Sequence, residues 1–170
     1  MRLHIFFLIL TISLCSISCT KGKNPNNTKS FTIVSIGSVV KAKGKSQIHL
    51  KNKYIKGLKG LSGYSHLFVF YWFDKNDTPK KRSILQVHPR GNKKNPLTGV
   101  FATRSPVRPN LMALSLCKII SIKGNIITIE KIDAFHNTPV LDIKPYIPFL
   151  DKPKEQIQLP SWVKKIHLKK

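Results

Sequence analysis

The chain has 170 residues, which is the length of one domain with extensions and argues against a second domain. Hydrophobic residues make up 41% of it and charged residues 22%, a balance typical of a globular protein. Its 30 Lys and Arg residues against seven Asp and Glu give a formal net charge of +23, which excludes an ordinary neutral surface and favours an anionic partner.

Residues 1–18, MRLHIFFLILTISLCSIS, have the layout of a cleavable export signal: one basic residue, an apolar core and small residues before Cys19. The apolar core is too short to favour a stable transmembrane helix. Cys19 and the polar residues after it match a bacterial lipoprotein cleavage site, although Ser16 stands where that pattern usually has Leu. We therefore expect a signal peptide and a protein of the cell envelope, attached to the membrane through Cys19. If the start codon is misplaced, a cytoplasmic protein is the alternative.

Residues 19–30 form a polar linker, and residues 31–151 form the predicted domain. Its apolar runs are short, rich in β-branched and aromatic residues, and separated by Gly, Pro and Asn, which predicts strands. This all-β pattern is typical of a barrel or a sandwich. The predicted strands are Phe31–Val40, Gln47–Leu50, Leu67–Phe73, Ile84–Val87, Val100–Thr103, Leu111–Ile122, Asn125–Ile132 and Pro139–Ile143.

Local signals refine this pattern at three places. Gly124 and Asn125, between ISIK and IITIE, predict a two-residue hairpin turn. Tyr54–Gly63 predicts one helical turn, because its three glycines disfavour a longer helix. Residues 152–170 are a basic extension punctuated by Pro, in which Trp162 is a candidate to anchor the tail on the barrel or on a membrane surface.

Cysteine usage limits the chemistry of the domain. Of three cysteines, Cys15 and Cys19 belong to the signal region, so Cys117 alone lies in the domain and cannot form an internal disulfide there. Its setting, LSLCKII, predicts a small core residue rather than a nucleophile. No spacing of Cys and His predicts a zinc site, and we expect no metal.

Arginine is concentrated in one segment. Five of the basic residues are Arg, and apart from Arg2 they all fall between positions 82 and 108. A guanidinium grips a carboxylate, a phosphate or a ring face with a defined geometry, so this segment predicts a binding site; chance and packing are the alternatives. Nucleic acid is the first candidate partner, followed by anionic lipid or polysaccharide. A composition rich in Lys, Asn and Ile also fits a solvated lysine surface with no ligand.

Five motifs in order resemble the TsaA-like (TrmO) family, the tRNA N6-threonylcarbamoyladenosine methyltransferases. They are IGSV, GLKGLSGYSHLFVFYWF, QVHPRG, GVFATRSPVRPN followed by LSL, and TPVLDIKPYIP after the hairpin. The resemblance covers about Ile36 to Trp162. It implies a compact antiparallel β-barrel that binds S-adenosyl-L-methionine, forms a homodimer and methylates a modified adenosine in tRNA. Methyl transfer needs positioning more than acid or base groups, which fits a chain without a catalytic triad motif.

The resemblance also implies site residues. Arg104 in ATRSP and Leu114 in ALSL correspond to cofactor contacts, and Asp133–His136, that is Asp133, Ala134, Phe135 and His136, corresponds to the segment that wraps the cofactor. Asp74 occupies a cofactor-contacting position that is commonly His. Further groups implied to face RNA or to line the pocket are Arg90, Arg108, Lys144 and Tyr146. No catalytic residue is implied.

The chain departs from the family at two places. The family's Pro-Arg-Gln segment between the first two strands is absent from KAKGKSQIHL, so part of the cofactor pocket is open to question. His136 and Asn137 replace the usual Asp-Gly before TPV; because Asn tolerates the left-handed conformation, we expect the turn to persist without its carboxylate.

Several polar residues have structural alternatives. Asp133 and Asp142 can serve as turn caps or as partners of the lysine excess rather than as site groups. His66, inside an apolar run, fits a hydrogen-bonded structural histidine better than a catalytic one. For His88, beside Pro89 in a loop, the two roles are equally open.

Two functions remain open. The first is an S-adenosylmethionine-dependent methyltransferase that acts on tRNA. The second is an exported, catalytically retired barrel that binds an anionic envelope component or a small ligand. The signal-like residues 1–18 favour the second, because an exported protein meets neither tRNA nor a cytosolic supply of the cofactor.

The N-terminal sequence makes a direct prediction. We expect the mature chain to begin at Cys19 and to fractionate with membranes, because the Ser-Ile-Ser-Cys end of residues 16–19 fits lipoprotein processing. Intact mass of the natively expressed protein measures this. An unprocessed Met1 terminus in a membrane-free fraction would contradict it and would favour the tRNA enzyme.

Overall fold

A computed structural model describes residues 29–42 and 44–163. The predicted signal peptide, Cys19 and the end of the basic extension therefore lie outside the described residues. The described residues from Ile33 onward form one compact unit. Among the described residues no helix has the length and apolar character needed to cross a membrane.

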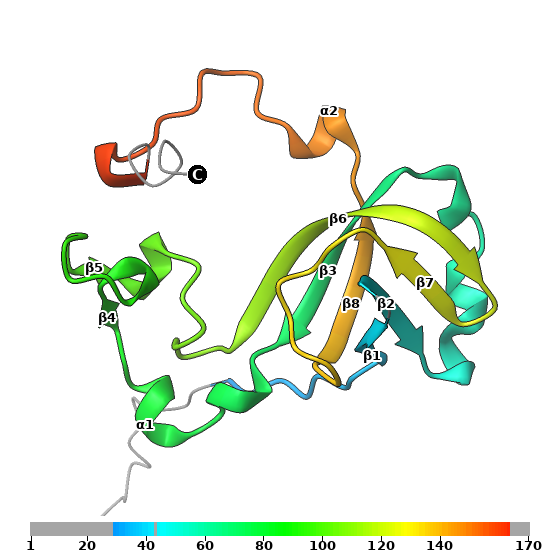
Figure 1. The fold of residues 1–170 in the computed structure, drawn as a ribbon, viewed down its shortest axis with the longest axis horizontal. Coiled ribbons are helices and arrows are strands. Elements are labelled where there is room, and N and C mark those ends of the chain that lie inside the picture. Colours follow the sequence, from blue (N-terminus) through cyan, green and yellow to red (C-terminus); the bar gives the residue numbers. More distant parts are fainter. Residues whose placement is uncertain (1–28, 43, 164–170) are drawn as a thin grey trace, which may run out of the picture. The chain divides into compact units, whose positions relative to one another are not determined.

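Six antiparallel strands close into a barrel in the order β1, β2, β7, β6, β3, β8 (Figure 1). Closure gives every barrel strand two neighbours and leaves no free edge. The predicted all-β barrel is thus confirmed. The barrel strands are β1 (Gly37–Ala42), β2 (Lys45–Leu50), β3 (His66–Trp72), β6 (Met112–Lys123), β7 (Ile126–Ile129) and β8 (Pro139–Pro145).

Strand β3 shows why these residues form a barrel. Its side chains alternate in burial, so that Leu67, Val69 and Tyr71 point into the core while their neighbours are partly exposed. β3 pairs along its whole length with β6 and also pairs with β8. The core that results contains Val39, Ile48, Leu50, Leu67, Val69, Tyr71, Ala113, Cys117, Ile127, Ile129, Ile132 and Val140.

A long excursion, Asp74–Asn110, leaves the barrel after β3 and returns at β6. It contains α1 (Pro79–Arg82) and a small separate sheet of β4 (Gln86–Val87) and β5 (Thr98–Gly99). Short 3-10 helices occupy Asp74–Asn76, Pro89–Gly91 and Val100–Ala102. After the barrel, α2 (Pro148–Asp151) precedes the C-terminal extension.

One strand prediction was wrong in part and another was wrong. The first strand begins at Gly37 rather than Phe31, and Phe31, Ile33 and Val34 are exposed. The apolar run Val100–Thr103 forms a 3-10 turn, because it follows the two-residue strand β5 and its backbone folds back from Thr103 to the Val100 carbonyl (3.2 Å). A short apolar run does not by itself distinguish a strand from a buried turn.

The predicted hairpin turn is confirmed. Lys123 and Ile126 pair across the hairpin, and Gly124 takes the positive φ of 58° for which glycine is suited. Asn125 also fixes the hairpin to the neighbouring strand, since its side-chain amide donates to the Leu50 carbonyl (2.8 Å). In place of one helical turn, 3-10 helices occupy Asn52–Leu58 and Leu61–Gly63.

Cys117 is a core residue, as predicted. It lies on β6 with 1% of its surface exposed. Burial raises the pKa of its thiol to about 11, so the thiol stays protonated and unreactive at neutral pH.

Gly37, in the IGSV motif, is required by close packing of β1 on β2. A Cβ at this position would clash with the His49 carbonyl oxygen and lie 2.9 Å from the Leu50 Cα, and neither backbone atom can move away independently. We predict that Gly37→Ala destabilises the barrel by roughly 1–3 kcal/mol, as overpacking does.

Gly57→Ala is the matched control, because a Cβ there meets nothing within 4 Å. Urea unfolding followed by circular dichroism measures both variants. A lowered midpoint for Gly37→Ala alone is expected, and equal midpoints would contradict the packing argument.

Candidate functional site

One cavity of about 440 Å³ lies where β3 ends and β6 begins. Its wall comes from the end of β3, the turn Asp74–Asn76, the returning part of the excursion, the start of β6 and the loop before β8. This volume is within the range of small-molecule sites. The lining residues are Tyr71, Trp72, Phe73, Asp74, Lys75, Asn76, Arg104, Pro106, Arg108, Met112, Ala113, Leu114, Ser115, Asp133, Ala134, Phe135 and Thr138.

Tyr71 joins the barrel core to the cavity wall. Its hydroxyl donates to the Asp133 carbonyl (2.8 Å) and lies 3.2 Å from the Ser115 hydroxyl. The side chain is 4% exposed, and burial raises its pKa above the ordinary value of 10.0. Tyr71 therefore remains a neutral hydrogen-bond donor and holds the Asp133 loop against β6.

The loop from Asp133 to Thr138 owes its shape to Asn137. Asn137 adopts a φ of 66°, which confirms the expectation that it replaces glycine in this turn. Its backbone N–H donates to the Val39 carbonyl (2.8 Å), and Val39 in turn donates to the Thr138 carbonyl (2.9 Å). The loop is thus fixed to β1 on one side and to Tyr71 on the other.

His136 faces away from the cavity, although it belongs to the predicted cofactor segment. Its Nδ1 accepts from the backbone N–H of Lys41 (3.2 Å), and it does not line the cavity. The other three residues of that segment, Asp133, Ala134 and Phe135, do line it.

The cavity combines both charges with apolar surface. Lys75, Arg104 and Arg108 supply positive charges to its lining, and Asp74 and Asp133 supply carboxylates. The Lys75 ammonium lies 4.1 Å from the centre of the Phe135 ring, so this aromatic ring already binds a cation of the chain itself.

Met112 and Leu114 supply exposed apolar surface from β6. This lining suits a ligand that has a flat apolar part, a positive charge and a negative charge.

The four arginines of the excursion have different positions. Arg104 and Arg108 line the cavity. Arg82 does not; it forms an ion pair with Asp77 (2.7 Å). Arg90 is exposed in the turn between β4 and β5, so the arginine cluster is not one site.

Hydrogen bonds within the turn that carries Arg90 stabilise its conformation. Arg90 takes a φ of 59°, which is uncommon for a residue with a side chain. His88 Nδ1 bonds the Asn95 carbonyl (2.8 Å), and the Asn95 amide donates to the Pro89 carbonyl (2.9 Å), so His88 has a structural role.

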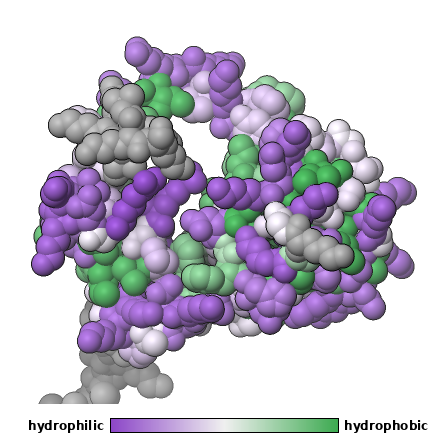
Figure 2. Space-filling view, in the orientation of Figure 1, coloured by the Kyte–Doolittle hydropathy of each residue, from purple (hydrophilic) through white to green (hydrophobic). Residues whose placement is uncertain are grey.

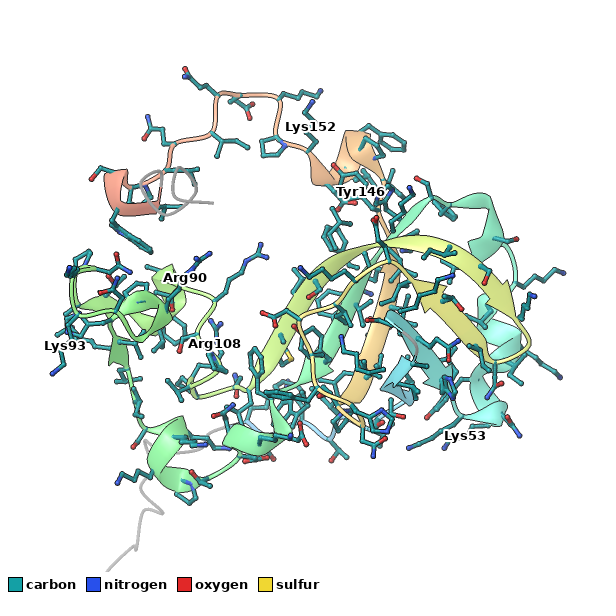
Figure 3. The ribbon with its side chains drawn as sticks, in the orientation of Figure 1. Lys53, Arg90, Lys93, Arg108, Tyr146 and Lys152 are labelled. Carbon is teal, nitrogen blue, oxygen red and sulfur yellow. The ribbon has the colours of Figure 1, made fainter. Side chains whose placement is uncertain are left out.

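Arg90 and Lys93 come from this turn (Figure 3) and, with Lys94, are exposed. On the face seen in Figure 2, hydrophilic residues predominate.

Two predicted residues lie on β8 or at its end, outside the cavity. Lys144 pairs with Asp142 (3.0 Å), which favours the structural interpretation of Asp142 as a partner of the lysine excess. Tyr146, labelled in Figure 3, packs edge-on against Phe68 with ring centres 5.7 Å apart. His66 also has a local partner, since its Nδ1 lies 2.9 Å from the Ser65 hydroxyl.

Sequence reasoning missed several cavity residues. Tyr71 carries a signal, because the alternation of FVFYWF places it on the inner face with Leu67 and Val69. Lys75, Met112 and Thr138 carry no comparable signal; their positions depend on which segments the barrel brings together.

The turn between β1 and β2, where the family's Pro-Arg-Gln segment is absent, lines a separate hollow with Glu130 and Ile132 rather than this cavity. Among the described residues, no group of three His, Cys, Asp or Glu side chains is placed to hold a metal ion. The cavity lining itself offers charged, hydroxyl and apolar groups that can bind and orient a ligand.

Comparison with known proteins gives a consistent set of relatives. The sequence model described as the tRNA-methyltransferase O N-terminal domain matches residues 29–152. A probable S-adenosyl-L-methionine-binding protein of Methanocaldococcus jannaschii is 46% identical over 124 residues, which are 73% of this chain and 98% of that protein. A protein of the same description from Pyrococcus horikoshii is 45% identical over 136 residues, 80% of this chain and 97% of that protein.

Longer proteins share the same domain. The human tRNA (adenine(37)-N6)-methyltransferase is 43% identical over 101 residues, which are 59% of this chain and 22% of that enzyme. A crystal structure of TrmO superposes with a TM-score of 0.60 at 24% identity, covering 76% of this chain and 64% of that one. TrmO from Pseudomonas aeruginosa gives a TM-score of 0.59 at 23% identity, with 76% and 61% covered. These structures share the fold, and the chain spans less than two thirds of their length.

Proposed function

The chain belongs to the tRNA-methyltransferase O N-terminal domain family, and from that premise we propose that its cavity binds S-adenosyl-L-methionine and that it acts as a methyltransferase on tRNA. The proposed substrate is N6-threonylcarbamoyladenosine. The observation that carries the proposal is the single cavity that gathers Asp74, Arg104, Leu114, Asp133, Ala134 and Phe135. Relatives described as probable S-adenosyl-L-methionine-binding proteins support it.

The lining fits the chemistry of this cofactor, which has an adenosine, a positively charged sulfonium and an amino acid group. Leu114 and Met112 offer apolar surface for a flat base, and Arg104 offers a guanidinium for a carboxylate. Asp133 offers an acceptor for hydroxyl or amino groups, and Phe135 adds an aromatic ring that the Lys75 ammonium already contacts. Asp74, where His is common in the family, adds a second carboxylate.

When bound, the cofactor supplies an electrophilic methyl group for transfer to the N6 nitrogen of the adenosine. The chain's own contribution is to bind and orient. Tyr71 keeps the Asp133 loop at a fixed distance from β6, and the neutral state of its hydroxyl preserves that contact at physiological pH. Proper placement of reacting atoms accounts for much of the rate enhancement in reactions of this kind.

The basic surface is the proposed contact for tRNA. Arg108 lies at the cavity, and Arg90 lies exposed in the turn between β4 and β5. Guanidinium groups at these positions can engage phosphates or base edges with two hydrogen bonds, while dispersed lysines contribute through counterion release.

We also propose a homodimer, on the basis of the outer face of β6. Met112, Leu114, Leu116 and Ile120 are exposed there, with 39–48% of each side chain accessible. Phe101, in the excursion, is 78% exposed. A second copy that covered β6 would bury this stripe and enclose the cavity edge formed by Met112 and Leu114.

A second candidate function follows from residues 1–18. If they direct export with a lipid on Cys19, the barrel resides in the cell envelope, where neither tRNA nor the cofactor is supplied, and its cavity would bind an anionic envelope component or a small ligand. The described residues do not include this segment. Whether it is cleaved decides between a cytoplasmic enzyme and a protein of the cell envelope.

Cofactor binding is testable by calorimetry. We predict saturable binding of S-adenosyl-L-methionine and loss of most of it in Arg104→Ala, because Arg104 provides a cavity guanidinium. At cofactor concentrations of about 100 times the dissociation constant, binding stabilises the native state against unfolding by about 2.7 kcal/mol. This also raises the melting temperature.

Arg90→Ala is the matched arginine control for this experiment, since Arg90 lies outside the cavity and its loss should leave cofactor binding unchanged. No heat and no thermal shift at millimolar cofactor would eliminate the proposed cofactor.

RNA binding has a different signature. We predict that affinity for tRNA falls linearly with the logarithm of salt concentration, and that Arg90→Ala and Arg108→Ala each lower the slope by about 1. Lys53→Ala, on the 3-10 helix after β2, is the control for a dispersed lysine. Filter binding over a salt series measures this. Equal losses from all three variants, with no preference for tRNA over heparin, would favour a nonspecific lysine surface.

A further inference from the structure

The excursion Asp74–Asn110 is long, yet it places Arg104 and Arg108 at the cavity. Among the described residues, hydrogen bonds join its two arms at successive levels. Next to the barrel, the Phe73 N–H donates to the Leu111 carbonyl (2.9 Å). At the far end, the Val100 N–H donates to the Leu85 carbonyl (2.9 Å), beside the β4–β5 pair. Arg82 makes the contact between these two levels.

Arg82 binds three separate elements with one guanidinium. Its Nε donates to Asp77 Oδ1 (2.7 Å), and its Nη1 donates to the Pro109 carbonyl (2.9 Å). The guanidinium also lies 5.3 Å from the ring centre of Trp72. Trp72 completes the group, because its indole N–H donates to Asp77 Oδ2 (3.0 Å).

Local sequence places Arg82 for these contacts. Thr78 caps α1, since its hydroxyl accepts from the Lys81 N–H (3.3 Å), and Pro79 begins the helix. One turn later Arg82 points its side chain toward the returning arm. Lysine cannot replace it, because a single ammonium does not offer the planar fork that spans a carboxylate and a carbonyl.

The charges of this group are intact at neutral pH. Hydrogen bonds from Arg82 and Trp72 lower the pKa of Asp77, and Asp77 raises the pKa of Arg82. Both side chains are more than one third exposed, so solvent and salt screen their attraction. The ion pair therefore fixes the relative positions of these groups and adds little to the free energy of unfolding.

Of the joined positions, one lines the cavity and another adjoins a lining residue in sequence. Trp72 lines it, and Pro109 directly follows Arg108, which also lines it. We infer that Arg82 is a positioning residue of the ligand site: it fastens the returning arm to the end of β3 and thereby sets the position of Arg108 relative to Trp72. The ligand part of this inference rests on the proposed cofactor function.

Hydrogen exchange tests the positioning directly in the full-length chain. In Arg82→Ala and in Arg82→Lys, amides of residues 104–111 should exchange faster than in the wild type, while those of β3 and β8 stay unchanged. Lys80→Ala is the matched control, because Lys80 lies in the same short helix, carries the same charge and is exposed. Unchanged exchange of residues 104–111 in both Arg82 variants would overturn the inference.

Calorimetry with S-adenosyl-L-methionine supplies the second readout. Arg82→Ala should weaken binding by about tenfold, within the range seen for residues that act through a neighbour, and Lys80→Ala should leave it unchanged. In an Arg108→Ala background the same change should weaken binding less, because Arg82 acts through that arm. If the losses of binding free energy in Arg82→Ala and Arg108→Ala were fully additive, the inference would be overturned.

The two proposals fail in different ways. If the wild-type chain binds no cofactor, the proposed function fails, and the exchange comparison still decides whether Arg82 positions the arm. If the wild type binds and both Arg82 variants match Lys80→Ala in exchange and affinity, the positioning role fails and the proposed function stands.

Discussion

The hydrogen bond from the buried Tyr71 hydroxyl to the Asp133 carbonyl connects the barrel core to the candidate site. Tyr71 reaches that position because β3 lies between β6 and β8 and directs alternate side chains inward. The same strand ends at Trp72, where the cavity wall and the excursion both begin. Core packing, the Asp133 loop and the returning arginine segment therefore depend on the placement of one strand.

The strands and turns of the barrel were predictable from sequence because their signals are local, whereas closure into a barrel rather than a sandwich was implied by the family resemblance. Alternation along β3, the Gly124–Asn125 turn and the left-handed Asn137 follow from strand periodicity and turn chemistry. Two features were not predictable in this way: the start of the first strand at Gly37 within the run Phe31–Val40, and the 3-10 turn at Val100–Ala102. Whether such a run pairs depends on a partner elsewhere in the chain.

The family motifs pointed to Arg104, Leu114 and Asp133, and the structure brings all three to the lining of one cavity. His136 shows the limit of that reasoning. It shares a motif with Asp133, but its ring turns to the Lys41 backbone on β1, a contact between residues far apart in sequence. The Phe135 contact with Lys75 and the Arg82 contact with Pro109 likewise depend on tertiary structure. The net charge of +23 gave no guide to which basic residues lie at the cavity.

The central claim is that the cavity between Leu114 and the Asp133 loop is the cofactor site. A crystal structure of the purified chain with S-adenosyl-L-methionine tests it most directly. The account predicts the ligand in contact with Leu114, Arg104 and the Asp133 loop, with Tyr71 still bonded to the Asp133 carbonyl. Density for the ligand elsewhere, such as the hollow bordered by Lys41, Ser46 and Glu130, with this cavity empty, would contradict it.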